Sequence, residues 1–174
     1  MTPLARIGEI MQLAFVPGDF QATIDHWLRC GAGPFFVLDN AVFNDLAFSG
    51  HPTRIQLTVA FGYWGDMQIE IMRQDNDAPS VYSRWRNAGR EGLHHVAVVV
   101  DDVEPARSAC VEAGARIVLD AAPPRGGRVI YAEVSQDEPL LEFITYTPER
   151  KAFYEMMRNA HRDWDGANPI RRVG

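Results

Sequence analysis

Four polar side chains stand in stretches that are otherwise apolar. Glu70 in MQIEIM and Glu142 in PLLEFI are single acids between apolar neighbours, while Gln12 lies in IMQLAF and His95 in LHHVAV. A carboxylate in a buried strand is costly unless it is paired or bound to a metal. Together the four side chains form an oxygen-rich set with one imidazole, and two negative charges balance a divalent cation. They predict one divalent ion, either Zn, Ni, Co, Mn, Fe or Mg, among which the sequence does not choose.

An internal repeat relates these four residues. Residues 10–32 and 93–115 align without a gap at a separation of about 80 residues. The repeat pairs Gln12 with His95, Ala14 with Ala97, Asp19 with Asp102, Gly31 with Gly114, and Ala32 with Ala115. Glu70 and Glu142 fall on the last strand expected in each half. Alone, Gln12 could be a polar strand-end residue and His95 a hydrogen-bonded core histidine. Their symmetric placement with two acids favours the metal site.

Each half has the pattern of a strand, a helix and three further strands. The first half has apolar or β-branched segments at 10–16, 34–38, 54–61 and 67–72, and the second half at 93–100, 115–119, 128–134 and 140–146. Asp19 and Asp102 stand where a helix needs an N-cap, and Gly31 and Gly114 stand where it ends. We expect Ser80 to cap a short helix over 80–88, and Thr147 and Pro148 to open a C-terminal helix.

These elements predict an α+β fold in which two βαβββ modules form a curved mixed sheet around a metal cleft, followed by a C-terminal helix. We expect a single domain over residues 1–174. Within it, module one spans 7–74, a linker spans 75–92, module two spans 93–147, and the C-terminal helix and tail span 148–174. Residues 39–53 are expected to be a long loop that could act as a lid, and the last residues to be irregular.

Composition limits the partners and the location. The 174 residues are 47% hydrophobic and 23% charged, as in an ordinary globular protein, and the formal charge of −6 argues against binding to nucleic acid. The N-terminal residues have neither the basic start of a signal peptide nor a long apolar run, so we expect no membrane partner and a cytoplasmic location. Cys30 and Cys110 are expected to be buried free thiols in a reducing compartment.

The stretch GLHHVAVVVDDV, the repeat and the apolar-Glu-apolar endings resemble the vicinal-oxygen-chelate superfamily, which includes glyoxalase I, methylmalonyl-CoA epimerase, extradiol dioxygenases and bleomycin-resistance proteins. The resemblance covers about residues 7 to 146. It implies a metal between the modules, held by residues on the first and last strands of each. These are Gln12, Glu70, His95 and Glu142 here. Glutamine at the first position resembles eukaryotic glyoxalase I.

The resemblance implies a metal-dependent isomerase or lyase of the glyoxalase I or acyl-CoA epimerase type. Such an enzyme polarises a carbonyl through the metal, passes through an enediolate and moves a proton with a carboxylate. Glu142 is the first choice for this base and Glu70 the second. The alternative is a small-molecule binder without catalysis, similar to the bleomycin-resistance proteins. An iron dioxygenase would need two histidines and one glutamate, and Gln12 departs from that pattern.

Four further residues are candidates for contact with a small-molecule substrate, namely Tyr131, Arg125, Arg128 and His51. Arg125 and Arg128 could bind an anion, although a solvated pair is the alternative reading. A glutathione clamp and the His-Pro-Lys stretch associated with the epimerase are absent, since the corresponding loop reads PPRGGRV. His94 should face away from His95, because side chains alternate along a strand. The superfamily resemblance implies a homodimer.

Overall fold

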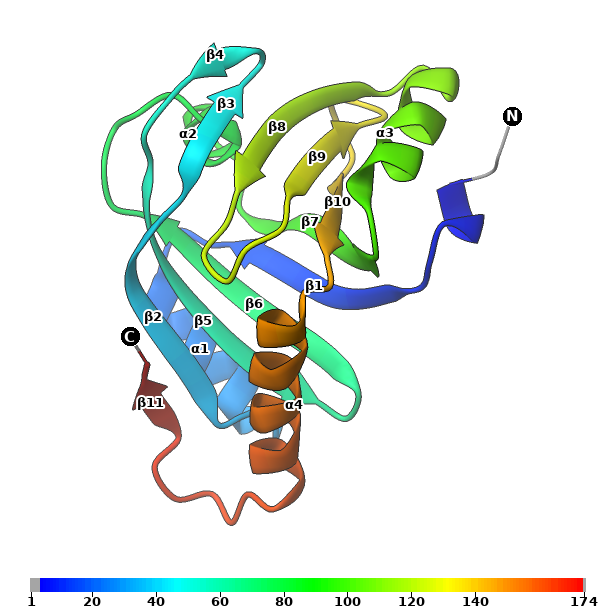
Figure 1. The fold of residues 1–174 in the computed structure, drawn as a ribbon. Helices are drawn as coiled ribbons and strands as arrows, with labels where there is room; N and C mark the ends of the chain where they lie inside the picture. Colours follow the sequence, from blue (N-terminus) through cyan, green and yellow to red (C-terminus); the bar gives the residue numbers. More distant parts are fainter. Residues whose placement is uncertain (1–3, 174) are drawn as a thin grey trace.

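The computed structural model describes residues 4–173 of the chain, so residues 1–3 and 174 of the expected domain lie outside it. The described residues form one mixed sheet of eleven strands with four α-helices, an α+β architecture (Figure 1). The strand order is β11-β2-β5-β6-β1-β7-β10-β9-β8-β3-β4. A short 3-10 helix, η1 (Leu4–Arg6), precedes the sheet.

The two halves of the chain have the same order of elements. The first half contains β1 (Ile10–Val16), α1 (Phe20–Arg29), β2 (Phe35–Val42), β3 (Asn44–Phe48), β4 (His51–Pro52), β5 (Gln56–Trp64) and β6 (Met67–Gln74). After α2 (Val81–Asn87), the second half contains β7 (Gly92–Val100), α3 (Val103–Glu112), β8 (Arg116–Ala122), β9 (Val129–Glu133) and β10 (Leu140–Thr145). Leaving out β3 and β4, each half is a βαβββ unit, as the repeat predicted.

The halves meet in the middle of the sheet, where β1 and β7 pair antiparallel. On either side, β1 pairs parallel with β6, and β7 pairs parallel with β10. The first strand of each half is therefore central, with the last strand of its own half beside it. This arrangement brings all four strands that carry the predicted metal ligands next to one another.

The helices begin and end where the sequence predicted. Asp19 accepts a hydrogen bond from the backbone N–H of Ala22 at the start of α1, and Asp102 accepts one from that of Glu104 at the start of α3. Ser80 forms a capping box with Ser83 at the start of α2. Such caps satisfy backbone donors that lack a partner within the helix. Beyond α1 and α3, Gly31 and Gly114 have φ of 88° and 79°, a conformation that favours glycine.

Both faces of the sheet are packed. On the outer face, Ile24 of α1 packs with Phe35 and Ile69, and Cys110 of α3 packs with Phe143. A larger inner cluster draws on both halves and includes Leu57 and Met72 from the first and Tyr131 and Ile144 from the second. The curved inner face therefore forms a shared core that neither half could complete alone.

The last helix, α4 (Pro148–Arg162), lies in front of the first-half strands in Figure 1, whereas α1 lies behind them. Tyr154 and Met157 of α4 are buried against Phe36 and Tyr63. Thr147 caps this helix and Pro148 opens it, as expected. A helix that follows the second half thus covers strands of the first half.

Three sequence-based expectations about the fold were wrong. Residues 39–53 are largely strand rather than loop, because β3 pairs antiparallel with β8 of the second half and with β4. The tail is not wholly irregular, since β11 (Ile170–Arg172) pairs parallel with β2. Cys30 is exposed rather than buried, because it follows the last residue of α1, whereas Cys110 is buried as expected.

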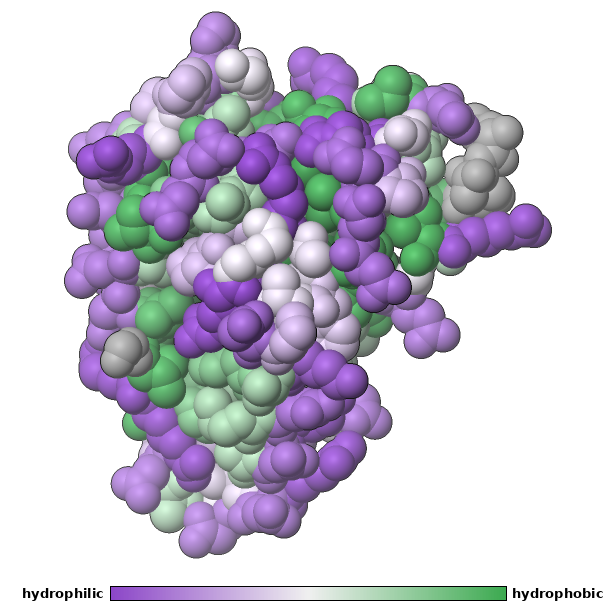
Figure 2. Space-filling model, viewed as in Figure 1, coloured by the Kyte–Doolittle hydropathy of each residue, from purple (hydrophilic) through white to green (hydrophobic). Residues whose placement is uncertain are grey.

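The visible surface is that of an ordinary globular protein, with hydrophilic residues over most of it and smaller hydrophobic areas between them (Figure 2). Among the described residues, no helix combines the length and the hydropathy required to span a bilayer.

Candidate metal centre

Three of the predicted ligands converge in the inner core. The Nε2 atom of His95 lies 3.3 Å from Oε2 of Glu70 and 3.1 Å from Oε2 of Glu142. One ligand atom from each residue lies within 4.8 Å of the others, and all three residues are buried. Two carboxylates and one imidazole nitrogen at these separations can bind one divalent ion with positions left for other ligands.

The register of the four central strands explains this convergence. Ala14 on β1 stands opposite Glu70 on β6 and opposite His95 on β7. Ala97 on β7 stands opposite Gln12 on β1 and Glu142 on β10. Residues directly opposite one another project from the same face of a sheet. Across the central strands, Ala14 therefore lies between Glu70 and His95, and Ala97 lies between Gln12 and Glu142. Both sets of side chains lie side by side where the two halves join.

Gln12, the fourth predicted ligand, is buried and lines the same cavity as Glu70 and Glu142. Its Nε2 donates a hydrogen bond of 2.6 Å to Oε1 of Gln68, and Nε2 of Gln68 donates one of 3.0 Å to the hydroxyl of Tyr63. Burial raises the pKa of Tyr63 to about 12, so its hydroxyl stays protonated. Because the amide nitrogen of Gln12 is engaged, its oxygen is the atom left for a metal.

The electrostatics of the three clustered residues match a site for a positive charge. Burial alone would lower the pKa of His95, but hydrogen bonds and charges from Glu142 and Glu70 raise it to about 9. Burial also raises the pKa of Glu70, against the effect of His95. Without a metal, a protonated His95 therefore supplies the charge that the carboxylates need. A divalent cation would replace that proton and balance both carboxylates.

Two tyrosines border the histidine. The hydroxyls of Tyr131 and Tyr82 lie 2.9 Å apart, and that of Tyr131 lies 3.4 Å from Nε2 of His95. Burial raises the pKa of both tyrosines well above the usual value, and the nearby carboxylates add to the effect. Both hydroxyls therefore remain protonated, and Tyr131 can donate a hydrogen bond inside the site.

A cavity of about 70 Å³ opens beside the cluster. Gln12, Glu70, Glu142 and Tyr131 line its polar side, and the other walls are mostly aromatic and aliphatic, including Leu38, Phe43, Val59, Phe61, Met72, Ile144, Phe153 and Tyr154. Ligand sites of proteins combine such apolar walls with a few convergent polar groups. The arrangement could therefore hold the apolar part of a small molecule with one polar atom against the cluster.

Arg125 and Arg150 both line this cavity, and neither guanidinium has a carboxylate partner among the described residues. The guanidinium carbon of Arg125 lies 3.8 Å from the centre of the Phe153 ring. Burial, and next the charge of Arg150, lower the pKa of Arg125. Arg150 is buried and donates to the backbone carbonyls of Thr145, Pro124 and Gly126, so its donors are engaged. Arg125 is thus the cation available to an anionic group of a ligand.

The structure brings two of the four predicted substrate contacts to the cavity and not the other two. Tyr131 and Arg125 line it, whereas Arg128 and His51 are not among the described residues that do. Arg128 donates to Asp120 at 2.7 Å and to Asp45 at 3.0 Å. His51 is exposed on β4, at the outer end of the sheet. It cannot act as a lid residue there, because the segment expected to be a loop is pinned to β8.

Several residues of the site carry no signal that the repeat could reveal. Arg150, Phe153 and Tyr154 come from α4, which has no counterpart in the repeat. Gln68 could have been found, because it lies two residues before Glu70 and so shares its face of the strand. His94 was expected to face away from His95, but the Nδ1 atoms of the two rings lie 2.9 Å apart.

Comparisons with known proteins agree with this architecture. Residues 11–131 match the profile of the glyoxalase/bleomycin resistance protein/dioxygenase superfamily. No curated protein sequence matches the chain. A hypothetical protein from Bacillus halodurans has a similar structure, with a TM-score of 0.57 and 15% identity over 80% of this chain and 95% of that one. Methylmalonyl-CoA epimerase from Mycobacterium tuberculosis has a TM-score of 0.57 and 14% identity over 87% of this chain and 97% of that one.

A third similar structure is a variant of Streptomyces coelicolor methylmalonyl-CoA epimerase in complex with 2-nitronate-propionyl-CoA. It has a TM-score of 0.53 and 15% identity over 82% of this chain and 96% of that one. At such identities the likeness concerns the fold. It supports the paired-module architecture and leaves the chemistry to the side chains of this chain.

Proposed function

Because this chain belongs to the glyoxalase/bleomycin resistance protein/dioxygenase superfamily, we propose that it is a metal-dependent isomerase or lyase that moves a proton next to a carbonyl group. The observation that carries the proposal is the buried convergence of Glu70, His95 and Glu142 beside a cavity. We propose that these residues and the amide oxygen of Gln12 hold one divalent ion.

When bound, a divalent ion would act as a Lewis acid for a substrate carbonyl. The residues of the chain would supply the rest. Tyr131 would donate a hydrogen bond to a substrate oxygen, because its hydroxyl stays protonated next to the cluster. Phe61, Phe153 and Tyr154 would exclude water from the apolar side of the cavity. Arg125 would bind an anionic group of the substrate near Phe153.

A carboxylate of the cluster would carry the proton. The sequence favoured Glu142, with Glu70 second, and both line the cavity. Burial raises the pKa of Glu70, which suits a group that must accept and return a proton near neutral pH. We therefore keep both carboxylates as candidates for the base.

Metal analysis and solvent exchange test this proposal. Protein purified without a histidine tag should contain about one divalent ion per chain, and Glu70→Ala and Glu142→Ala should lose it. Thioesters and 2-oxo acids incubated in deuterated solvent should exchange the proton next to the carbonyl with the wild-type protein. Glu70→Gln and Glu142→Gln should each be assayed, and the base is the residue whose loss abolishes exchange while metal is retained.

A binding protein without catalysis is the second candidate, favoured by one observation. The phenylalanines Phe43, Phe61 and Phe153 give the cavity aromatic walls, and His95 already satisfies both carboxylates without a metal. Stoichiometric metal in the wild-type protein argues for the enzyme, whereas tight binding of an aromatic ligand to metal-free protein argues for the binder.

The homodimer and the cytoplasmic location belong to the same proposal. The superfamily resemblance supports the dimer, and sedimentation equilibrium of the purified protein tests it.

A further inference from the structure

His95 uses only one of its two ring nitrogens in the candidate metal centre. Its Nε2 faces the carboxylates of Glu70 and Glu142, and its Nδ1 lies 2.9 Å from Nδ1 of His94. Both imidazoles are fully buried. Histidines that bind metals commonly donate the second ring N–H to a carboxylate, a carbonyl or water, which fixes their tautomer and orientation. Here that place is taken by another imidazole.

We propose that His94 is a positioning residue that fixes the tautomer and ring orientation of His95 by accepting a hydrogen bond at Nδ1. This inference rests on the proposed function, since it concerns how the proposed metal ligand is held.

The direction of the hydrogen bond follows from proton counting. Two Nδ1 atoms that face each other at 2.9 Å share one hydrogen. A metal-bound His95 must present the lone pair of Nε2 and therefore carries its hydrogen on Nδ1. A protonated His95 in the metal-free protein also carries a hydrogen there. In both states His94 Nδ1 is the acceptor, so the neutral His94 carries its hydrogen on Nε2.

The far side of His94 imposes no competing requirement. Its Nε2 is buried and has no hydrogen-bond partner of standard geometry among the described residues. The tautomer of His94 is therefore decided by the contact between the two Nδ1 atoms.

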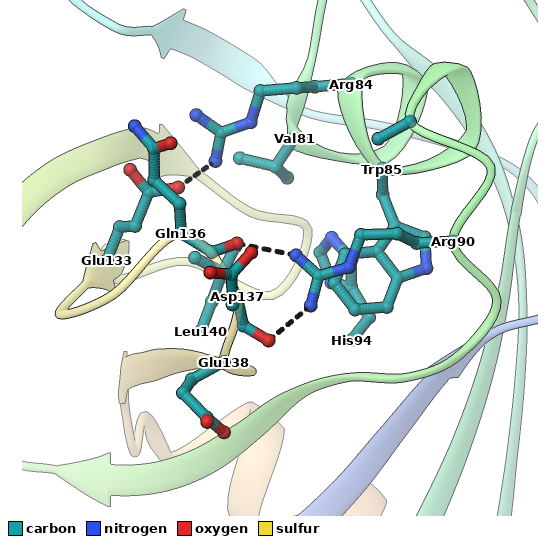
Figure 3. Close-up of a pocket in the computed structure, with 11 residues that line it drawn as sticks. Val81, Arg84, Trp85, Arg90, His94, Glu133, Gln136, Asp137, Glu138 and Leu140 are labelled. Carbon is teal, nitrogen blue, oxygen red and sulfur yellow. Dashed lines mark hydrogen bonds and ion pairs between the residues drawn. The ribbon is translucent and has the colours of Figure 1, made fainter.

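Aromatic neighbours hold the His94 ring in place. Tyr82 stacks on it, with ring centres 5.1 Å apart and planes inclined by 26°, and Trp85 meets it edge-on at 5.1 Å. The guanidinium carbon of Arg90 lies 3.9 Å from the centre of the Trp85 ring, and Arg90 also donates to the backbone carbonyls of Gln136 and Asp137. Figure 3 shows His94 behind Trp85 and the extended Arg90. The acceptor is thus rigidly placed.

A neutral acceptor also suits the charge of the site. A carboxylate at this position would make His95 more basic and would bring a third negative charge close to Glu70 and Glu142. An imidazole orients the ligand without adding charge, so two carboxylates remain to balance one divalent ion.

A pair of variants tests the proposal through metal affinity. His94→Phe keeps an aromatic ring against Tyr82 and Trp85 but removes the acceptor, and it should weaken Zn²⁺ binding about 10- to 100-fold. His94→Asn loses the ring but places an oxygen where Nδ1 was, and it should bind Zn²⁺ more tightly than His94→Phe. Titration calorimetry of each metal-free protein gives the affinities, and thermal unfolding shows that each variant is folded.

The outcomes separate this inference from the proposed function. A wild-type protein that binds no divalent ion overturns both. A wild-type protein that binds Zn²⁺ with the same affinity as His94→Phe overturns the positioning role alone, and so does a His94→Asn variant that is no better than His94→Phe. Nitrogen-15 spectra of the Zn²⁺-bound wild-type protein need no variant. They should show hydrogen on Nδ1 of His95 and none on Nδ1 of His94, and the reverse pattern contradicts the proposal.

Discussion

At the scale of the residue, the centre depends on an imidazole between two carboxylates. Nε2 of His95 contacts both Glu70 and Glu142, and the ring has no exposed surface. Isolated buried charges are costly, whereas paired and hydrogen-bonded charges persist. The same atoms that would bind a metal therefore also form a stable arrangement without it, in which a proton takes the place of the cation.

This proton makes the stability of the metal-free protein depend on pH. The pKa of His95 rises from 6.5 in the unfolded chain to about 9 in the folded protein. Protonation of His95 in the folded protein contributes of the order of 3 kcal/mol to the free energy of unfolding. This contribution is complete below pH 6.5 and is lost as the pH rises through about 9. The pKa of Glu70 is also raised, which gives the same sign. With a chelator present, the free energy of unfolding should fall from pH 6.5 to 9 in urea titrations.

A double variant, His95→Gln with Glu70→Gln, provides the control for this effect, because neither amide titrates and the variant should show a much weaker dependence. A metal-free wild-type protein whose free energy of unfolding is constant or rises over this interval contradicts the prediction.

The sequence could predict the convergence of Glu70, His95 and Glu142 because the two halves carry the same anomaly. An acid in an apolar strand is unusual, and its occurrence at matching places in both halves suggests a shared role. The repeat pairs Glu70 with Glu142 and Gln12 with His95. It could not predict that Arg128 would be engaged by Asp120 and Asp45, since those partners come from a different strand and a different half. Nor could it predict the contact between His94 and His95, because the register of β7 against β1 shifts between Leu93 and His95 and the alternation of side chains is interrupted there.

At the scale of the element, the two central alanines leave room for the ligands. Ala14 lies between Glu70 and His95, and Ala97 lies between Gln12 and Glu142 in the register of the sheet. Both are buried. Side chains directly opposite one another in a sheet have Cβ atoms about 5 Å apart, so a larger residue in the middle would occupy the space of its neighbours.

Ala97→Val should therefore weaken metal binding by at least about tenfold, and overpacking should cost about 1–3 kcal/mol in the free energy of unfolding. Val96→Ile is a matched control, because it also enlarges a side chain of β7 but on the opposite face of the strand. Metal titration and urea unfolding of both variants check the prediction. Equal metal affinity for Ala97→Val and the wild-type protein contradicts the assigned role of the alanine.

Local signals predicted the elements of the two modules better than those outside them. The strand Ile10–Val16 agrees with its predicted bounds, and the helix caps Asp19, Asp102, Ser80 and Thr147 are confirmed. These signals depend on neighbours in the chain. The strand β3 was missed because its pairing partner, β8, lies in the other half, and no local pattern marks such a partner.

At the scale of the whole molecule, each half supplies two of the four proposed ligands. A metal held by both halves would bind the folded chain and not the unfolded one, and so would stabilise it by about 4 kcal/mol at a thousand times its dissociation constant. Adding such an excess of metal to the chelator-treated protein should raise the melting temperature by about 8–16 °C.

Thermal unfolding with and without metal checks this expectation, and Glu142→Ala is the control that should not respond. An equal rise in the variant would mean that the ion acts elsewhere on the surface. An unchanged melting temperature in the wild-type protein would mean that the two halves are not joined by a metal.

The pairing of β3 with β8 has a consequence for the order in which the protein is made. During synthesis β3 leaves the ribosome about 70 residues ahead of its partner, which is roughly 4–14 s at 5–20 residues per second. One edge of β3 can pair with β4 at once, but over that interval the backbone donors and acceptors of its other edge are open to other chains. The first half therefore cannot mature as an independent unit, and its vulnerability to misassembly ends only when β8 has been translated.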